Sequence, residues 1–240
     1  MLAALHKAKE WKQLAEVPAK PRILGDTLDK RFVTEEHFVA LLDTLRDKPD
    51  AVWLPNCAAV NYTAADWWSA LLVYLWITGM RITATLSLRW EDIDLVQGLA
   101  KSRACDNKGR RDSLAVITAA VPLLERIRGF GDLVFPWTNG HGALWATFHR
   151  LQATAGIDLV CTRGCDPHTP ACSKYGFHDF RRSLATMNVG VASNEALQSQ
   201  MGHRSFQTTQ RYVTYAKAHR PAFAAYLPAG LAEKLRRNTA

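Results

Sequence analysis

The sequence predicts an α+β domain that is mainly helical and has a small three-stranded antiparallel sheet at one edge. Hydrophobic residues make up 48% of the 240 residues, enough to bury a core. Apolar residues recur at helical spacing over most of the chain. Residues 90–118 break that pattern with three short β-prone runs, WEDIDL, GLAKSRAC and SLAVIT, which are separated by turn-forming segments. These runs predict the sheet, and the flanking segments predict the helices.

The N-terminal segment, residues 1–17, is predicted to be helical because its apolar residues recur at every third or fourth position. Pro18 and Pro21 end this pattern, so we expect residues 18–33 to be a linker. Thr34 is expected to cap a second helix, with two glutamates in the first turn, where they interact favourably with the helix dipole. The apolar face of that helix is formed by Phe38, Leu41, Leu42 and Leu45.

A loop at residues 47–61 leads to the most apolar segment, WWSALLVYLWITG, which is predicted to be the central core helix. Thr63 and Asp66 form a capping-box pattern before it, and Gly79 is expected to end it. The helix is apolar on all sides, so we interpret its tryptophans as core residues rather than as base-stacking side chains. These are Trp67, Trp68 and Trp76.

Further helices are predicted on both sides of the sheet from the same spacing and from glycine punctuation. RITATLSL predicts a short helical turn before the sheet. Helices after the sheet are expected at residues 120–128, 143–155, 178–189, 194–201 and 208–218. Apolar residues at four-residue steps predict a last amphipathic helix in the tail, residues 221–240.

The charge balance suits a polyanionic partner. The chain carries 30 Lys and Arg residues against 22 Asp and Glu residues, a formal charge of +8. The longest apolar run, residues 67–80, is shorter than the roughly 20 residues that span a bilayer. The first residues do not show the signal-peptide pattern of a positively charged region followed by an apolar region. We therefore expect a cytoplasmic protein that does not enter a membrane.

Several polar motifs occur in a fixed order along these elements. T-G-x-R and L-R-W-x-D-I lie within WITGMRITATLSLRWEDIDL. H-x-x-R lies within YGFHDFRRSLATMNVG, and G-H, with a tyrosine nine residues after the histidine, lies within MGHRSFQTTQRYVTYA. Over about residues 65–218 this order and spacing resemble the tyrosine recombinase (phage integrase) family. The resemblance implies that family's catalytic fold and site-specific recombination or integration of double-stranded DNA.

The residue types in these motifs suit attack on a phosphodiester. Such attack builds charge on the non-bridging oxygens, which planar guanidinium groups hold bidentately. Arg81 and Arg181 are the candidates for this clamp. His178, three residues before Arg181 on a predicted helix, is expected to face the same phosphate. The resemblance gives His178 a role in proton transfer or phosphate binding, and it gives His203 a phosphate contact.

The resemblance assigns the nucleophile to Tyr212, nine residues after His203, and implies a 3′-phosphotyrosyl bond with a free 5′-hydroxyl. A phenol titrates near pH 10, so it needs a cationic pocket or a base. Tyr215 is the rival nucleophile, but the spacing favours Tyr212. The family's general acid is a lysine on a turn between two strands, which matches Lys108 in DNKGRR, with Lys101 as second choice. The phosphotyrosine keeps the bond energy, so no cofactor is required.

Members of the family have a helical core-binding domain before the catalytic domain and act as a homo-tetramer on two DNA duplexes. Here about thirty residues precede the expected catalytic domain, so we expect residues 1–33 to be the last helix of the core-binding domain plus a linker. Residues 34–220 are the expected catalytic domain, and residues 221–240 the tail helix, which would dock on a neighbouring protomer. Such a truncated chain would keep its catalytic residues but bind DNA weakly, because backbone binding is largely counterion release.

A cysteine and histidine cluster falls in an apparent insertion at about residues 160–175. Its members have the ligand types of a structural zinc site, although their spacing matches no standard zinc knuckle. They are Cys161, Cys165, His168 and Cys172. The alternative is an ordinary loop with reduced thiols.

Other functions remain open from the sequence. One is a type IB-like topoisomerase that relaxes DNA lacking a recombination site. Another is a non-catalytic DNA-binding remnant of a truncated integrase, and a third is a metal-stabilised interaction module. The single residues also have structural readings, with Arg81 at a helix end, Tyr212 in a core and Lys108 on an exposed turn.

Overall fold

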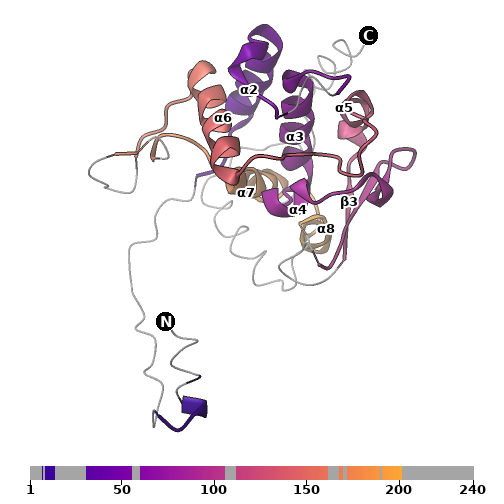
Figure 1. Cartoon of the computed structure of the whole chain (residues 1–240), viewed down its shortest axis with the longest axis vertical. Helices are drawn as coiled ribbons and strands as arrows, with labels where there is room; N and C mark the ends of the chain where they lie inside the picture. Colours follow the sequence, from indigo (N-terminus) through magenta and orange to yellow (C-terminus); the bar gives the residue numbers. More distant parts are fainter. Residues whose placement is uncertain are drawn as a thin grey trace.

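The computed structural model describes residues 7, 9–13, 31–55, 60–105, 112–161, 168–169, 172–189 and 191–201 (Figure 1). The α-helices are α2 (Glu35–Asp47), α3 (Ala64–Thr78), α4 (Ile82–Leu86), α5 (Val121–Arg126), α6 (His141–Thr154), α7 (Phe177–Asn188) and α8 (Asn194–Gln200). The strands are β1 (Ile93–Asp94), β2 (Leu99–Ser102) and β3 (Ser113–Val116). Short 3-10 turns are η1 (Pro49–Ala51), η3 (Trp90–Asp92) and η4 (Thr118–Ala120). The predicted fold class, mainly helical with a small antiparallel sheet, is confirmed.

Helices α2 and α3 begin at the predicted caps. Thr34 accepts a hydrogen bond from the His37 amide at 3.3 Å. Thr63 accepts one from the Asp66 amide at 3.1 Å, and the Asp66 carboxylate accepts one from the Thr63 amide at 2.9 Å. These bonds satisfy amide groups that have no partner inside the helix, which fixes where each helix starts.

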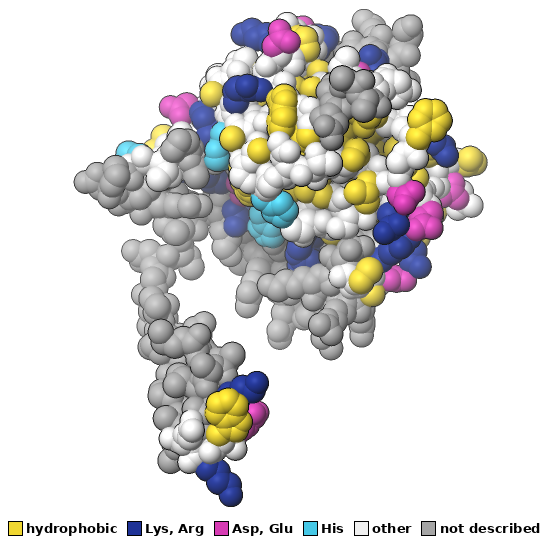
Figure 2. Space-filling model, viewed as in Figure 1, with side chains coloured by type: hydrophobic (Ala, Val, Ile, Leu, Met, Phe, Trp, Pro, Cys, Tyr) yellow, Lys and Arg dark blue, Asp and Glu magenta, His cyan; other side chains and the backbone are white. Residues whose placement is uncertain are grey.

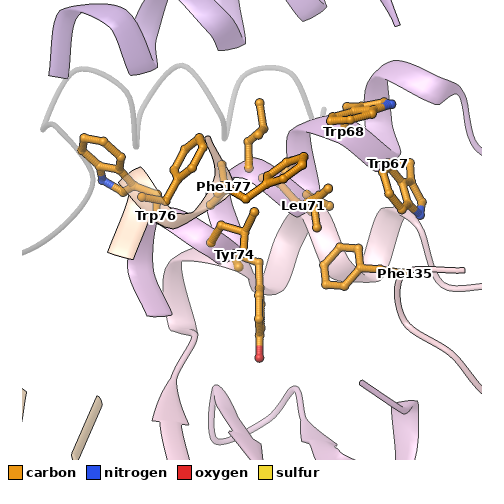
Figure 3. Close-up of a cluster of buried hydrophobic side chains, with 14 of the residues drawn as sticks. Trp67, Trp68, Leu71, Tyr74, Trp76, Phe135 and Phe177 are labelled. Carbon is orange, nitrogen blue, oxygen red and sulfur yellow. The ribbon is translucent and has the colours of Figure 1, made fainter. Parts of the chain in front are cut away.

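Helix α3 lies at the centre of an aromatic core to which α2, α6 and α7 contribute (Figure 1). Phe38 of α2 stacks on Trp76 of α3 with ring centroids 4.1 Å apart. Phe148 of α6 stacks on Phe177 of α7 at 4.6 Å. All three tryptophans of α3 are buried, so their interpretation as core residues is confirmed. Figure 3 labels the buried side chains Trp67, Trp68, Leu71, Tyr74, Trp76, Phe135 and Phe177.

The sheet has the order β1-β2-β3, and both pairings are antiparallel. In the register of β2 and β3, Ala100 faces Ala115, and both are buried. Only two residues of the run WEDIDL pair in the sheet. The amide of Trp90 instead donates to the carbonyl of Asp132 at 2.9 Å, and η3 replaces the start of the predicted strand.

The side chain of Gln200, at the end of α8, joins the sheet to the helical core. Its amide oxygen accepts a hydrogen bond from the Val116 amide at 3.0 Å. Its amide nitrogen donates to the Val116 carbonyl at 3.1 Å and to the Ile77 carbonyl at 2.9 Å. This one side chain therefore pairs with the outer edge of β3 and with the last turn of α3, and it fixes the end of α8 beside both.

Three predicted helices differ from the structure or lie outside the described residues. The backbone near the N-terminus is helical at residues 7, 9 and 10 and then turns at residues 11–13. The helix therefore stops before residue 17, because Lys12 has a positive φ of 57°, which no α-helix accommodates. The predicted helices at residues 208–218 and 221–240 lie outside the described residues. Among the helices of the described ranges, none has the length and apolar character needed to cross a bilayer.

Candidate active site

The turn between α3 and α4 carries Arg81 and depends on Gly79. Gly79 caps α3 in the left-handed conformation, with φ 57° and ψ 21°. A Cβ at this position would lie 2.8 Å from Cδ2 of Leu184 and 3.4 Å from Cα of Arg181. Glycine is therefore required both for the backbone conformation and for the close approach of α7. Arg81 follows as the N-terminal cap residue of α4, with a half-buried side chain.

Arg181, on α7, is the central residue of the site. Its side chain is only 2% exposed. One terminal nitrogen donates to the carbonyl of Gly79 at 2.8 Å, and the other donates to the carbonyl of Met201 at 2.7 Å. These bonds connect α7 with the end of α3 and the end of α8. Both acceptors are neutral, so the bonds orient the guanidinium without cancelling its positive charge.

His178 lies one turn before Arg181 and shares its surroundings. Desolvation, the largest cause, and the nearby charges of Arg182, Arg181 and Arg81 together lower the pKa of its imidazole to about 4. The residue is nevertheless exposed at the surface. The imidazole is therefore neutral at pH 7, where it can donate one hydrogen bond and accept another. The charges of Arg81 and Arg181 thus both act on the imidazole of His178.

Two residues of α7 that were not predicted from the sequence, Asp179 and Ser183, hold the helix in place. The Asp179 carboxylate accepts a hydrogen bond from the Gly176 amide at 2.7 Å and forms an ion pair with Arg182 at 2.6 Å. Burial raises the pKa of Asp179, while these two partners lower it. On the next turn, Ser183 donates to the carbonyl of Val33 at 2.8 Å. An acidic residue three positions after a glycine was the available signal for this cap.

Three of the six predicted catalytic residues, Lys108, His203 and Tyr212, lie outside the described residues, as does the rival Tyr215. Lys101, the second choice for the general acid, lies on β2 with its side chain 53% exposed and its ammonium 2.9 Å from the Asp112 carboxylate. In Figure 2, basic and acidic side chains lie side by side over the region of the sheet, whereas histidine side chains near the middle of the molecule have Lys and Arg beside them.

Three of the four predicted metal ligands also come together. The ligand atoms of Cys161, His168 and Cys172 all lie within 4.8 Å of one another. Cys165 lies outside the described residues. This cluster immediately precedes α7 in the chain.

The known protein family that matches the chain is the phage integrase family, over residues 31–219. The tyrosine recombinase XerD of Staphylococcus saprophyticus is 26% identical over 231 residues, which cover 89% of this chain and 66% of that protein. XerD of Pseudomonas putida is 31% identical over 166 residues, covering 62% of this chain and 50% of that protein. The chain thus spans between half and two thirds of the length of these relatives.

Solved structures of the same fold are also similar. A lambda integrase(75-356) dimer bound to a COC′ core site matches with a TM-score of 0.62 and 15% identity, covering 93% of this chain and 73% of that one. The XerH site-specific recombinase bound to palindromic difH substrate, in a post-cleavage complex, matches with a TM-score of 0.57 and 20% identity, covering 82% and 53%. At these identities the likeness establishes the fold.

Proposed function

This chain belongs to the phage integrase family, and from that membership we propose that it cleaves and rejoins DNA at specific sites through a 3′-phosphotyrosyl intermediate. The observation that carries the proposal is that the charges of Arg81 and Arg181 both act on the imidazole of His178. Gly79 lets α7 approach the turn that carries Arg81, and the carbonyl of Gly79 accepts a hydrogen bond from Arg181. Two guanidinium groups and a neutral imidazole are suited to a single phosphodiester.

The arginines supply the electrostatic part of the reaction. Charge builds on the two non-bridging oxygens when a nucleophile attacks phosphorus, and fixed cations stabilise that charge without reorganising. The guanidinium of Arg181 is already fixed by two carbonyl groups, so it is oriented before a phosphate binds. Arg81 is half-buried at the start of α4 and would contact the phosphate from the other element.

Tyr212 is the proposed nucleophile. Its phenolic oxygen would form a bond to phosphorus while the bond to the 5′-oxygen breaks, and Lys108 would give that oxygen a proton. A 5′-hydroxyl reverses the step, so the exchange requires neither ATP nor a cofactor. His203 is proposed to contact the same phosphate. In support of this, the carbonyl of Met201, two residues before His203, lies 2.7 Å from Arg181.

We further infer that the catalytic domain begins at residue 31 rather than at residue 34. Val33 is fully buried, and its carbonyl accepts the hydrogen bond from Ser183 of α7. Arg182 also donates to the carbonyl of Arg31 at 3.4 Å. Double-stranded DNA is the proposed substrate, and a homo-tetramer on two duplexes is the proposed active assembly. The tail, residues 221–240, is proposed to dock on a neighbouring protomer.

Covalent trapping on a suicide substrate tests this function. The substrate is a nicked duplex that carries the attachment sequence next to the gene, so that a short 5′-hydroxyl fragment diffuses away after cleavage. We expect a protein–DNA band on a denaturing gel with the wild type and with Tyr215→Phe, and none with Tyr212→Phe. A band lost in Tyr215→Phe and kept in Tyr212→Phe would reassign the nucleophile.

The same preparation separates the alternatives. Relaxation of a supercoiled plasmid without an attachment site would favour a topoisomerase. Salt-dependent DNA binding without any covalent band, on every substrate offered, would contradict catalysis and favour a DNA-binding remnant.

A further inference from the structure

The segment that connects α6 to α7 has no part in the proposed strand exchange. Cys161 lies in the first half of this segment, and His168 and Cys172 lie in its second half. One sulfur, one imidazole and a second sulfur nevertheless gather with all ligand atoms within 4.8 Å of one another. Cys172 is buried, Cys161 is half-buried and His168 is exposed, so the cluster lies at the surface with one ligand anchored in the protein.

The separations are close to those that a tetrahedral metal ion imposes. With metal–sulfur bonds of about 2.3 Å and metal–nitrogen bonds of about 2.0 Å, neighbouring ligand atoms lie roughly 3.5–3.8 Å apart. Because no two ligand atoms of the cluster are more than 4.8 Å apart, each pair needs to approach by at most about 1 Å to hold such an ion. The imidazole of His168 has a nitrogen within 4.8 Å of both sulfurs.

The surroundings of Cys172 suit a thiolate. The amide of Thr169 donates to the sulfur at 3.3 Å, and the Thr169 hydroxyl lies 3.4 Å from it. The amide of Cys172 in turn donates to the carbonyl of Thr169 at 2.8 Å. Donors to a ligating sulfur fix its position and tune its charge in metal sites.

Hydrogen bonds join the start of the α6–α7 segment to its end. The amide of Leu159 donates to the carbonyl of Ser173 at 2.9 Å, and the ammonium of Lys174 donates to the carbonyl of Ile157. Gln152 of α6 accepts from the amide of Tyr175 at 2.7 Å. The positions of Cys161 and Cys172 are therefore set by paired backbone, directly before α7 begins.

We propose that Cys161, His168 and Cys172 bind one structural zinc ion. The ion would link the two halves of the α6–α7 segment and stabilise the start of α7. Two thiolates and an imidazole prefer zinc to magnesium or calcium, which take oxygen ligands. A water molecule would complete the tetrahedral set of four ligands. Binding would release the protons of the thiols, because the metal takes thiolates.

Metal content of the purified full chain is the direct test. The chain is reconstituted with one equivalent of zinc chloride under reducing conditions, freed of loose metal by gel filtration and analysed by inductively coupled plasma mass spectrometry. We expect about one zinc per chain in the wild type and in the matched control Cys105→Ser, whose cysteine is exposed and outside the cluster. Cys161→Ser and Cys172→Ser should each retain at least fivefold less zinc.

A second measurement avoids the risk that a variant fails to fold. Titrating the wild-type chain with Co²⁺ should give thiolate-to-metal charge-transfer absorption and the intense d–d bands of a tetrahedral site, both abolished by one equivalent of Zn²⁺. Chelation should lower the thermal midpoint of the wild type and leave that of Cys172→Ser unchanged. Absence of the cobalt bands, equal zinc in wild type and Cys172→Ser, or an intact mass showing a Cys161–Cys172 disulfide would each overturn the proposal. None of these readouts depends on DNA cleavage.

Discussion

Arg181 on α7 and Arg103, just after β2, carry the same guanidinium group in different surroundings. Arg103 binds the carboxylates of Asp92, at 2.8 Å, and of Glu91, so its charge is compensated within the sheet region. Arg181 is buried against two carbonyl groups, which orient it and leave the charge of the cation in place. We therefore expect Arg181, rather than Arg103, to bind a phosphate.

The largest effect is expected from changing Arg181 to lysine. Arg181→Lys keeps a positive charge but cannot span the carbonyls of Gly79 and Met201 and a phosphate together. Cleavage of the suicide substrate should fall about 10³-fold, the upper range for loss of one preorganised donor group. Arg103→Lys, the matched control, should cleave within about twofold of the wild type, because its ion pairs with Asp92 and Glu91 lie outside the α7 site. Single-turnover rates measure both, and equal losses would remove the distinction between the two regions.

The next largest effect concerns the general acid, for which Lys108 and Lys101 are the two candidates. Lys108→Ala should slow cleavage about 10²-fold, as expected for loss of a proton donor. Lys101→Ala should leave the rate nearly unchanged, because the ammonium of Lys101 is paired with Asp112 on an exposed face. A substrate with sulfur at the 5′-bridging position needs no proton on departure, so it should restore the rate of Lys108→Ala. The reverse pattern would transfer the role to Lys101.

A smaller effect concerns the contact that joins α3 to α7. Gly79→Ala combines a left-handed backbone with a Cβ 2.8 Å from Leu184, whereas Gly156→Ala meets the same backbone strain, φ 72°, with no atom within 4 Å. Strain alone should cost about 1–2 kcal/mol in free energy of unfolding. Gly79→Ala should lose roughly 1–3 kcal/mol more from overpacking. Urea unfolding measures both variants, and equal losses would show that α7 yields to the added methyl group.

The helical half of the site was largely predictable from the sequence. Thr63 and Asp66 encode the start of α3, Gly79 encodes its end, and the interval between His178 and Arg181 places both on one helix. Long apolar runs and caps are local signals, so they survive in a single sequence. The packing of Arg181 against Met201 and the bridge from Gln200 to β3 were not predictable, because each joins segments far apart in the chain and neither has a local pattern.

The smallest predicted effect is the pH dependence that His178 adds to stability. Its folded pKa of about 4 lies below the ordinary value of 6.5, so the unfolded chain binds the proton more readily between these values. The contribution of His178 is therefore fully present above about pH 6.5 and is lost as the pH falls through this window. Burial raises the pKa of Asp179, which acts in the opposite direction on acidification, and His149 also has a lowered pKa. The wild type must therefore be compared with His178→Asn by urea unfolding at pH 7 and pH 5. The variant should lose less stability between the two pH values. Identical losses would mean that desolvation and the neighbouring arginines do not hold the imidazole neutral, and a neutral His178 at the phosphate site would have to be abandoned.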